Sequence, residues 1–352
     1  MPIQTAADSI SNSAGSPYGF KNRIINGAMA IDQRNAGGSV TYTAAGTSGG
    51  FHIDRYTFNN TATSGNTTCQ QSSTAPTGFT KSFYCLNNAA GTATTTQKVR
   101  IYQPIEGYNV ADLGWGASGA SSVTLSFWVR SSIIGTYAGA LINENVDRSY
   151  VFTYTINVAN TWEYKTVTIP GDTSGTWPTI NGVGIYVMWD LGSGSSMNGT
   201  ANTWSSSYIH RTSGSTNWVA TSGATFYITG VQLEKGTQAT AFDYRPYGAE
   251  FALCQRYFEI SGATTNSLLF QGYVGSASAI RCPLFYNVTK RVQPTVTVVP
   301  SAASWTYSNG SGLFVANAGV DTTRMEWNTA GAGMSYAHNA SGGTYLTISA
   351  EL

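Results

Sequence analysis

Apolar and polar residues alternate along several short stretches of the chain. In residues 123–130, Val123, Leu125, Phe127 and Val129 occupy every second position. Successive side chains of a β-strand point to opposite faces, so this alternation predicts a strand with one face in a core. Strand-like patterns also occupy residues 51–58, 149–158, 162–170 and 224–234. Residues 182–190 are more continuously apolar, as expected of a central strand.

The strand patterns recur at short intervals without helical patterns between them. They predict an all-β protein, with a jelly-roll-like antiparallel β-sandwich followed by a second, smaller β-sandwich domain. The expected divisions are an N-terminal arm (1–22), the jelly-roll-like sandwich (23–248), a linker or short helix (249–260) and a C-terminal distal β-domain (261–352). Residues 191–225 form a long stretch rich in Gly, Ser, Thr and Asn, and such loops are uncommon unless functional or disordered.

Composition supports the all-β prediction. The 352 residues include 21 Tyr, 14 Phe and 9 Trp, which suit half-buried pleated surfaces. Only 10% of residues are charged, against roughly 25% in an average domain. With 41% hydrophobic residues and a net charge of +1, the chain lacks the composition of a disordered protein. So weakly charged a surface suits either a protein that is largely covered in an assembly or an ordinary β-domain solvated by hydroxyls and amides.

Several classes of partner and site are not predicted. The first residues lack the basic and apolar regions of a signal peptide, and no apolar stretch reaches the length of a transmembrane helix. Scattered Lys and Arg form no basic run, so we expect neither nucleic-acid binding nor membrane insertion. Cys69, Cys85, Cys254 and Cys282 lack zinc-ligand spacing. Cys69 and Cys85 could pair across neighbouring strands, but free buried thiols are the favoured interpretation.

Two segments resemble proteins of tailed bacteriophages. Residues 20–35, FKNRIINGAMAIDQRN, are similar to a recurrent opening of phage tail-fibre and minor structural proteins. Residues 226–259, FYITGVQLEKGTQATAFDYRPYGAEFALCQRYFE, resemble the segment that ends their jelly-roll domain, and residues 126–130, SFWVR, fit the same pattern. The resemblance implies a virion location, a jelly roll related to carbohydrate-binding modules, and homotrimeric assembly. On this reading we expect the arm to attach the chain to other virion proteins. The resemblance supplies no catalytic residues.

Catalytic motifs are weak. Residues 46–50 match the G-x-S-x-G nucleophile elbow, but no helix pattern follows the serine to expose its hydroxyl. Glycoside hydrolysis requires two carboxylates across the scissile bond, and Glu144 with Asp147 or Glu163 with Asp190 are candidates. Sequence alone cannot place either pair in one cleft. We expect no enzyme activity, and keep polysaccharide depolymerase as a third hypothesis.

Metal and ion-pair candidates are equally sparse. His52, His210 and His338 are too far apart for metal-ligand spacing. Asp172 and Asp190 could contribute to a calcium site, but no EF-hand-like spacing accompanies them. We predict neither a metal nor another cofactor. Asp243 and Arg245, on either side of Tyr244, are expected to form a structural ion pair or a backbone clamp.

Sugar binding is the main candidate for a site. Saccharide rings have apolar C–H faces, so their sites combine flat aromatic side chains with a few polar groups. The long polar stretch contains residues of the right types, namely Trp204, Tyr208, His210, Arg211 and Trp218. The competing interpretation, which we favour, is that these aromatics hold the loop against the sandwich or pack between protomers.

These observations lead to one main hypothesis and its rival. The main hypothesis is a virion structural protein of tail-fibre type that attaches to the particle by its arm, assembles as a homotrimer and contacts a glycan of the host surface. The rival is a separate carbohydrate-binding module or lectin, in which replacing Trp204 or Trp218 by alanine would weaken glycan binding.

Overall fold

The protein is described by a computed structural model that covers residues 21–43, 49–262, 268–274, 279–299, 305–307, 310–329, 333–339 and 345–352. Its sheets are antiparallel and its helices few and short, which confirms the all-β sandwich. The chain divides into two compact units, Met1–Arg245 together with Leu352, and Pro246–Glu351. Apart from residues 21 and 22, the predicted arm lies outside the described residues, as does Ser48 of the candidate nucleophile elbow.

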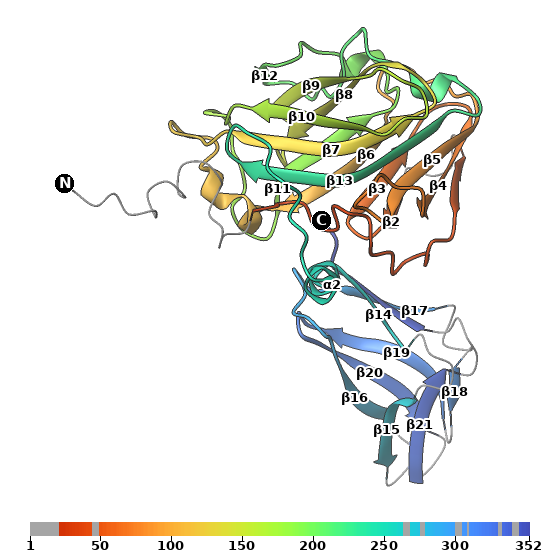
Figure 1. Cartoon of the computed structure of the whole chain (residues 1–352). Helices are drawn as coiled ribbons and strands as arrows, with labels where there is room; N and C mark the ends of the chain where they lie inside the picture. Colours follow the sequence, from red (N-terminus) through yellow and green to blue (C-terminus); the bar gives the residue numbers. More distant parts are fainter. Residues whose placement is uncertain are drawn as a thin grey trace, which may run out of the picture. The chain divides into compact units, whose positions relative to one another are not determined.

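The first unit is a sandwich of two sheets (Figure 1). The six-stranded sheet contains, in spatial order, β1 (Val40–Thr43), β4 (Asn66–Ser72), β5 (Ser82–Ala89), β13 (Thr225–Lys235), β7 (Val123–Ser131) and β10 (Glu163–Ile169). The seven-stranded sheet contains β12 (Trp204–Ser205), β9 (Ser149–Ile156), β8 (Gly135–Ile142), β11 (Val183–Asp190), β6 (Val99–Glu106), β3 (Tyr56–Asn60) and β2 (Gly50–Ile53). Short 3-10 helices occupy Gly107–Asn109, Ala111–Leu113, Ser195–Met197 and Trp218–Ala220.

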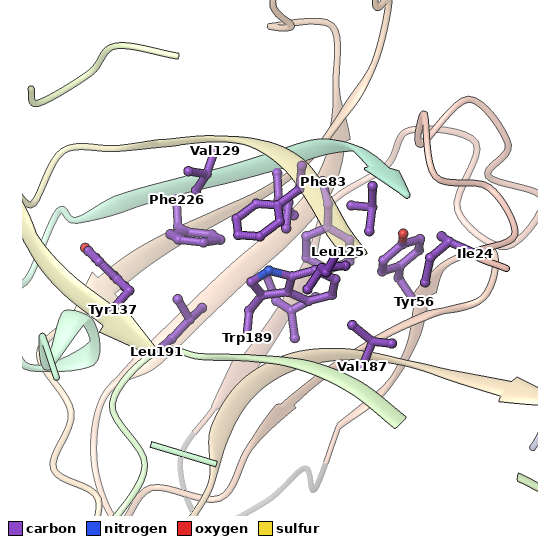
Figure 2. Close-up of a cluster of buried hydrophobic side chains, with 14 of the residues drawn as sticks. Ile24, Tyr56, Phe83, Leu125, Val129, Tyr137, Val187, Trp189, Leu191 and Phe226 are labelled. Atoms are coloured by element: carbon purple, nitrogen blue, oxygen red, sulfur yellow. The ribbon is translucent and has the colours of Figure 1, made fainter. Parts of the chain in front are cut away.

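Side chains from both sheets meet in one large core. The predicted inward face of residues 123–130 is confirmed, because Val123, Leu125, Phe127 and Val129 are fully buried. Figure 2 shows Leu125 beside Trp189 of β11, and Val129 next to Phe226 of β13. The rings of Phe127 and Trp189 pack edge to face, with centroids 5.7 Å apart. Burial of these large side chains is the main source of stability for the sandwich.

The strand-like pattern at residues 51–58 forms two strands. β2 and β3 pair with each other as a hairpin, and Arg55 between them has a positive φ of 72°. His52 and Phe58 both face the core, although the reversal of the chain lies between them. Because the turn is this short, few polar residues separate the two strands, and the sequence pattern looks like one continuous strand.

The two segments that resemble phage proteins lie against each other and close the sandwich, and we call their contact the closure clamp (residues 21–27 with 231–245). Arg23 N–H donates to the Leu233 carbonyl (2.9 Å), and the Asn22 side chain donates to the Val231 carbonyl (3.1 Å). The Arg245 guanidinium donates to the carbonyls of Asn22 and Ile24. With its Nε also 3.9 Å from an Asp243 oxygen, Arg245 confirms the predicted ion pair and backbone clamp.

The second unit begins with α2 (Tyr247–Gln255), so a nine-residue helix occupies much of the predicted linker. Three three-stranded sheets follow the helix. The core of the second unit includes Leu284, Met325 and Trp327. The strands of the three sheets are β14 (Phe258–Ser261), β22 (Tyr345–Ser349) and β17 (Thr295–Val299); β15 (Leu268–Val274), β21 (Gly333–Asn339) and β18 (Trp305–Tyr307); and β16 (Ala279–Phe285), β20 (Thr322–Thr329) and β19 (Gly310–Ala318). Among the helices that the structure describes, none has the length and apolar character needed to span a bilayer.

Candidate functional site

The structure separates the five residues that sequence reasoning proposed as a sugar site. Trp218 is fully buried in the sandwich core, so its indole presents no face to a ligand. Trp204 is half-buried, and its indole N–H donates to the Pro170 carbonyl (2.9 Å). Its ring packs edge to face against Trp115 (5.4 Å) and Trp177 (5.5 Å). Trp204 and Trp218 therefore hold the 191–225 loop against the sandwich.

His210 and Arg211 are structural as well. His210 is fully buried, with its Nδ1 3.3 Å from an oxygen of the fully buried Asp190, and Arg211 Nε lies 3.8 Å from the same carboxylate. Burial alone would raise the pKa of Asp190, but the contacts with His210 and Arg211 outweigh it and lower that pKa. Asp190 also accepts the N–H groups of Gly192 and Ser193. This buried network fixes the start of the loop, and it corrects the expectation that His210 contacts a ligand.

Tyr208 differs from the other four because it joins a group of partly exposed tyrosines on the outer face of a sheet. Tyr102 on β6 and Tyr186 on β11 stand on the outer face of the seven-stranded sheet, since their neighbours Ile101 and Val187 face the core. The rings of Tyr102 and Tyr186 lie 6.0 Å apart at 70°. We call Tyr102, Tyr186 and Tyr208, with Lys98 and Arg100, the tyrosine patch. Beneath it lies a small apolar layer of Ala140, Ile142 and Met188, all buried.

Two cationic side chains hold the tyrosine patch together. The Arg100 guanidinium lies 5.0 Å from the Tyr102 ring centroid and 5.6 Å from that of Tyr208. Arg100 also donates a hydrogen bond to the Tyr208 hydroxyl, and Lys98 Nζ stands 4.9 Å from the Tyr208 ring. Cation–π contacts of this kind stabilise by about 0.5–2 kcal/mol according to exposure. Arg100 is nearly buried, whereas the tyrosines and Lys98 remain partly exposed, so aromatic and cationic groups are both accessible.

The electrostatics of the patch also include Glu144, an exposed residue in the turn between β8 and β9. Burial, then the neighbouring Tyr102 and Glu144, raise the pKa of the Tyr186 hydroxyl, while Arg100 acts in the opposite direction. The hydroxyl therefore stays protonated at neutral pH and can donate as well as accept a hydrogen bond. Next to Tyr102 across the sheet, Thr57 has a buried hydroxyl without a hydrogen-bond partner among the described residues.

Sequence reasoning missed Tyr102, Tyr186 and Arg100. The signal that could have found them is the alternation of side chains between the two faces of a strand. In β11, Val187 and Trp189 face the core, so Tyr186 must lie on the opposite face, and the same alternation with Ile101 places Tyr102 outside. That these two outward tyrosines are neighbours depends on β6 pairing with β11, and a single sequence does not specify that pairing.

The carboxylates proposed for glycoside hydrolysis have structural partners. Glu144 Oε1 accepts the Val183 N–H (3.2 Å), and Asp147 Oδ1 accepts a hydrogen bond from Asn143 (2.6 Å). Glu163 binds the side chains of Asn157 and Lys165 on β10 of the six-stranded sheet, whereas Asp190 belongs to the seven-stranded sheet. Asp172, proposed for calcium, forms a bidentate pair with Arg148 at 2.7 and 2.8 Å. The described part of the chain contains no group of three or more His, Cys, Asp or Glu that could hold a metal ion.

Comparison with known proteins gives only distant structural likenesses. No family model and no curated protein matches the chain. Solved structures similar to it include the enzymatically active domain of tailspike protein 4 of bacteriophage CBA120, at 12% identity and a TM-score of 0.31. The match covers 52% of this chain but 19% of the tailspike chain.

Carbohydrate-binding modules are also among the similar structures. TmCBM61 in complex with β-1,4-galactotriose has 7% identity and a TM-score of 0.29, with coverage of 61% of this chain and 99% of that one. A family 11 module of Clostridium thermocellum, in complex with a mixed-linked tetrasaccharide, has 11% identity and a TM-score of 0.26, with coverage of 59% and 95%. At TM-scores this low, neither likeness carries an argument about function.

Proposed function

We propose that the first unit is a carbohydrate-binding domain and that the tyrosine patch is its binding surface. The observation that carries the proposal is the arrangement of Tyr102, Tyr186 and Tyr208, partly exposed beside Arg100 and Lys98 on one face of the sheet. Aromatic faces suit the apolar C–H faces of a sugar ring, and the nearby N–H and O–H groups suit its hydroxyls.

The patch is also well ordered before any ligand arrives. Arg100 contacts both Tyr102 and Tyr208, and its hydrogen bond to the Tyr208 hydroxyl fixes a side chain that comes from the loop. The buried Asp190–His210 contact anchors the same loop two residues further along. Ordering a free side chain on binding costs about 0.5–1.5 kcal/mol, and a preorganised patch avoids that cost, which favours affinity.

Alanine variants of the full chain test this proposal. Tyr102→Ala and Tyr186→Ala should each weaken glycan binding at least about tenfold, a loss of about 1.4 kcal/mol. Binding is measured as retention on a glycan array, followed by calorimetry with the retained glycan. Tyr108→Ala is the matched control, because Tyr108 is 61% exposed on a 3-10 helix outside the patch. Equal losses in control and patch variants, or an array that retains no wild-type protein, would contradict the proposal.

We further propose that the chain serves in a phage virion as a homotrimeric component of tail-fibre type, with the glycan on the host surface. Two observations support this proposal. The segments that resemble phage proteins join in one closure clamp, and only 10% of the residues are charged. Repeated weak sites on a trimer would gain by avidity what each lacks alone. Sedimentation equilibrium should give three times the 37.3 kDa chain mass. A micromolar monomer that does not associate with particles would refute this role.

A further inference from the structure

A cavity of about 400 Å³ opens on the outer face of the six-stranded sheet, on the other sheet from the tyrosine patch. Every residue that lines it belongs to the first unit, between residues 79 and 242, and none of them is charged. Trp128, Tyr164 and Gly230 line the part over the sheet, and Phe79, Thr240 and Phe242 line the part formed by loops. Its volume lies in the range of small-ligand sites.

The sheet provides an aromatic floor. Trp128 on β7 and Tyr164 on β10 are directly paired across the strands, with ring centroids 5.4 Å apart at 46°. The third position of the floor is Gly230, at a bulge of β13 where the register shifts between Thr229 and Gln232. A Cβ on Gly230 would lie 2.7 Å from the Phe79 ring and 3.0 Å from the Trp128 ring. The glycine therefore allows the floor and the wall to approach closely.

The wall is a preformed aromatic cluster. Phe79 packs edge to face on Phe242 (5.0 Å), and Phe242 on Tyr244 (4.8 Å). The Tyr244 hydroxyl donates to the Gly78 carbonyl (2.7 Å), which ties the segment after β13 to the loop before β5. Phe242 and Tyr244 belong to the AFDYRP stretch of the phage-like segment, whose Asp243 and Arg245 are used by the closure clamp. Alternate residues of this stretch thus differ in role: the charged groups belong to the clamp, Phe242 lines the cavity, and Tyr244 supports Phe242 from outside the lining.

We propose that this cavity is a second ligand site, which takes one or two rings of an uncharged saccharide. Flat aromatic faces on two sides suit the C–H faces of a pyranose ring, and Ser126, Tyr164 and Thr240 carry hydroxyls among the lining residues. The Thr240 hydroxyl already donates to Glu234, so toward a sugar it can act as an acceptor. The absence of charge among the lining residues selects a neutral sugar over an acidic one, in contrast to the Lys98 and Arg100 of the tyrosine patch. The inference does not require that the tyrosine patch bind any glycan.

The test follows the Trp128 indole N–H signal by NMR in the full chain, with Trp128→Phe used to assign it. Cellohexaose, maltohexaose and xylohexaose are titrated separately. At least one should shift the signal, and Tyr164→Ala should weaken that binding about tenfold. Tyr164 is 44% exposed, so its removal should leave the fold intact. Ala239→Leu, which adds side-chain volume to the cavity lining, should also weaken that binding and provides an independent second variant.

Four outcomes bear on the proposal. Tyr186→Ala should leave the Trp128 titration unchanged, and an equal loss in this variant would overturn the assignment of two sites. If no saccharide shifts the signal at millimolar concentration, the proposal is wrong. It is also wrong if a short leucine-rich peptide shifts the signal while the sugars do not. A Trp128 response together with tyrosine-patch variants that bind all glycans normally would refute the proposed function and leave this inference standing.

Discussion

Gly27→Ala should strongly destabilise the first unit, because Gly27 lies where the closure clamp has no room for a side chain. A Cβ at this position would lie 2.2 Å from the Val231 carbonyl oxygen and 3.3 Å from the Asn22 side-chain nitrogen. An ordinary contact requires about 3.4 Å, so the backbones must separate by about 1 Å. The Val231 N–H, which donates to the Gly27 carbonyl at 2.9 Å, would move with them.

The magnitude follows from two effects. Forcing a methyl group into a well-packed site costs about 1–3 kcal/mol. Weakening the Val231–Gly27 hydrogen bond, and the Asn22–Val231 bond beside it, costs about 0.5–1.5 kcal/mol each. Offsetting them, alanine restricts the unfolded chain and recovers about 0.4–1 kcal/mol. The net expectation is a loss of about 1–6 kcal/mol, with a central value of about 3 kcal/mol.

Urea unfolding of the full chain, followed by tryptophan fluorescence, measures this loss. Gly50→Ala is the matched control, because a Cβ on Gly50 of β2 meets no atom within 4 Å. The control should unfold at the same urea concentration as the wild type or slightly higher. If Gly27→Ala stays within about 0.5 kcal/mol of Gly50→Ala, the clamp does not hold the sandwich closed and the reasoning fails.

Three further predictions concern buried side chains. Trp218→Ala should cost about 3–5 kcal/mol in urea unfolding because the indole is fully buried, and glycan affinity of the molecules that remain folded should be unchanged. Cys69 and Cys85 are directly paired across β4 and β5 with their sulfurs 2.8 Å apart, but both are fully buried. The disulfide oxidant diamide should therefore remove two hydrogen atoms from the pair, reversibly with dithiothreitol, slowly in the folded protein and faster at urea concentrations that begin to open the sandwich. Burial lowers the pKa of His52 to about 4 from an unfolded value of about 6.5. The unfolded state therefore binds the proton first, so stability should fall by about 3 kcal/mol between pH 6.5 and 4, and His52→Phe should remove that part of the slope.

Alternation along single strands made the sheets predictable, and pairing between distant strands made the site unpredictable. The inward face of β7 follows from its sequence alone, because every second residue is apolar. The outer faces of β8 and β9 are less clear, since Ala138 and Val151 point away from the main core yet are covered by Ile209 of the long loop. Burial on both faces hides the period of two.

The long loop shows the same limit. Its aromatic residues are of the types that bind sugars, but Trp218 and Trp204 are used to attach the loop to the sandwich. Tyr208 remains partly exposed and groups with Tyr102 and Tyr186, which come from strands about a hundred and about twenty residues earlier. Residue type therefore indicated the kind of chemistry, and only the tertiary structure indicated which side chains are accessible.

The closure clamp also determines how the first unit would respond to tension. Residues 22–24 and Arg245, the two ends of the sandwich, are joined by hydrogen bonds, although more than two hundred residues lie between them. A pull on these ends is carried by the clamp, and the strands between them lie outside the path of the force. The sandwich would keep its shape, and its two outer faces, until the clamp itself ruptures.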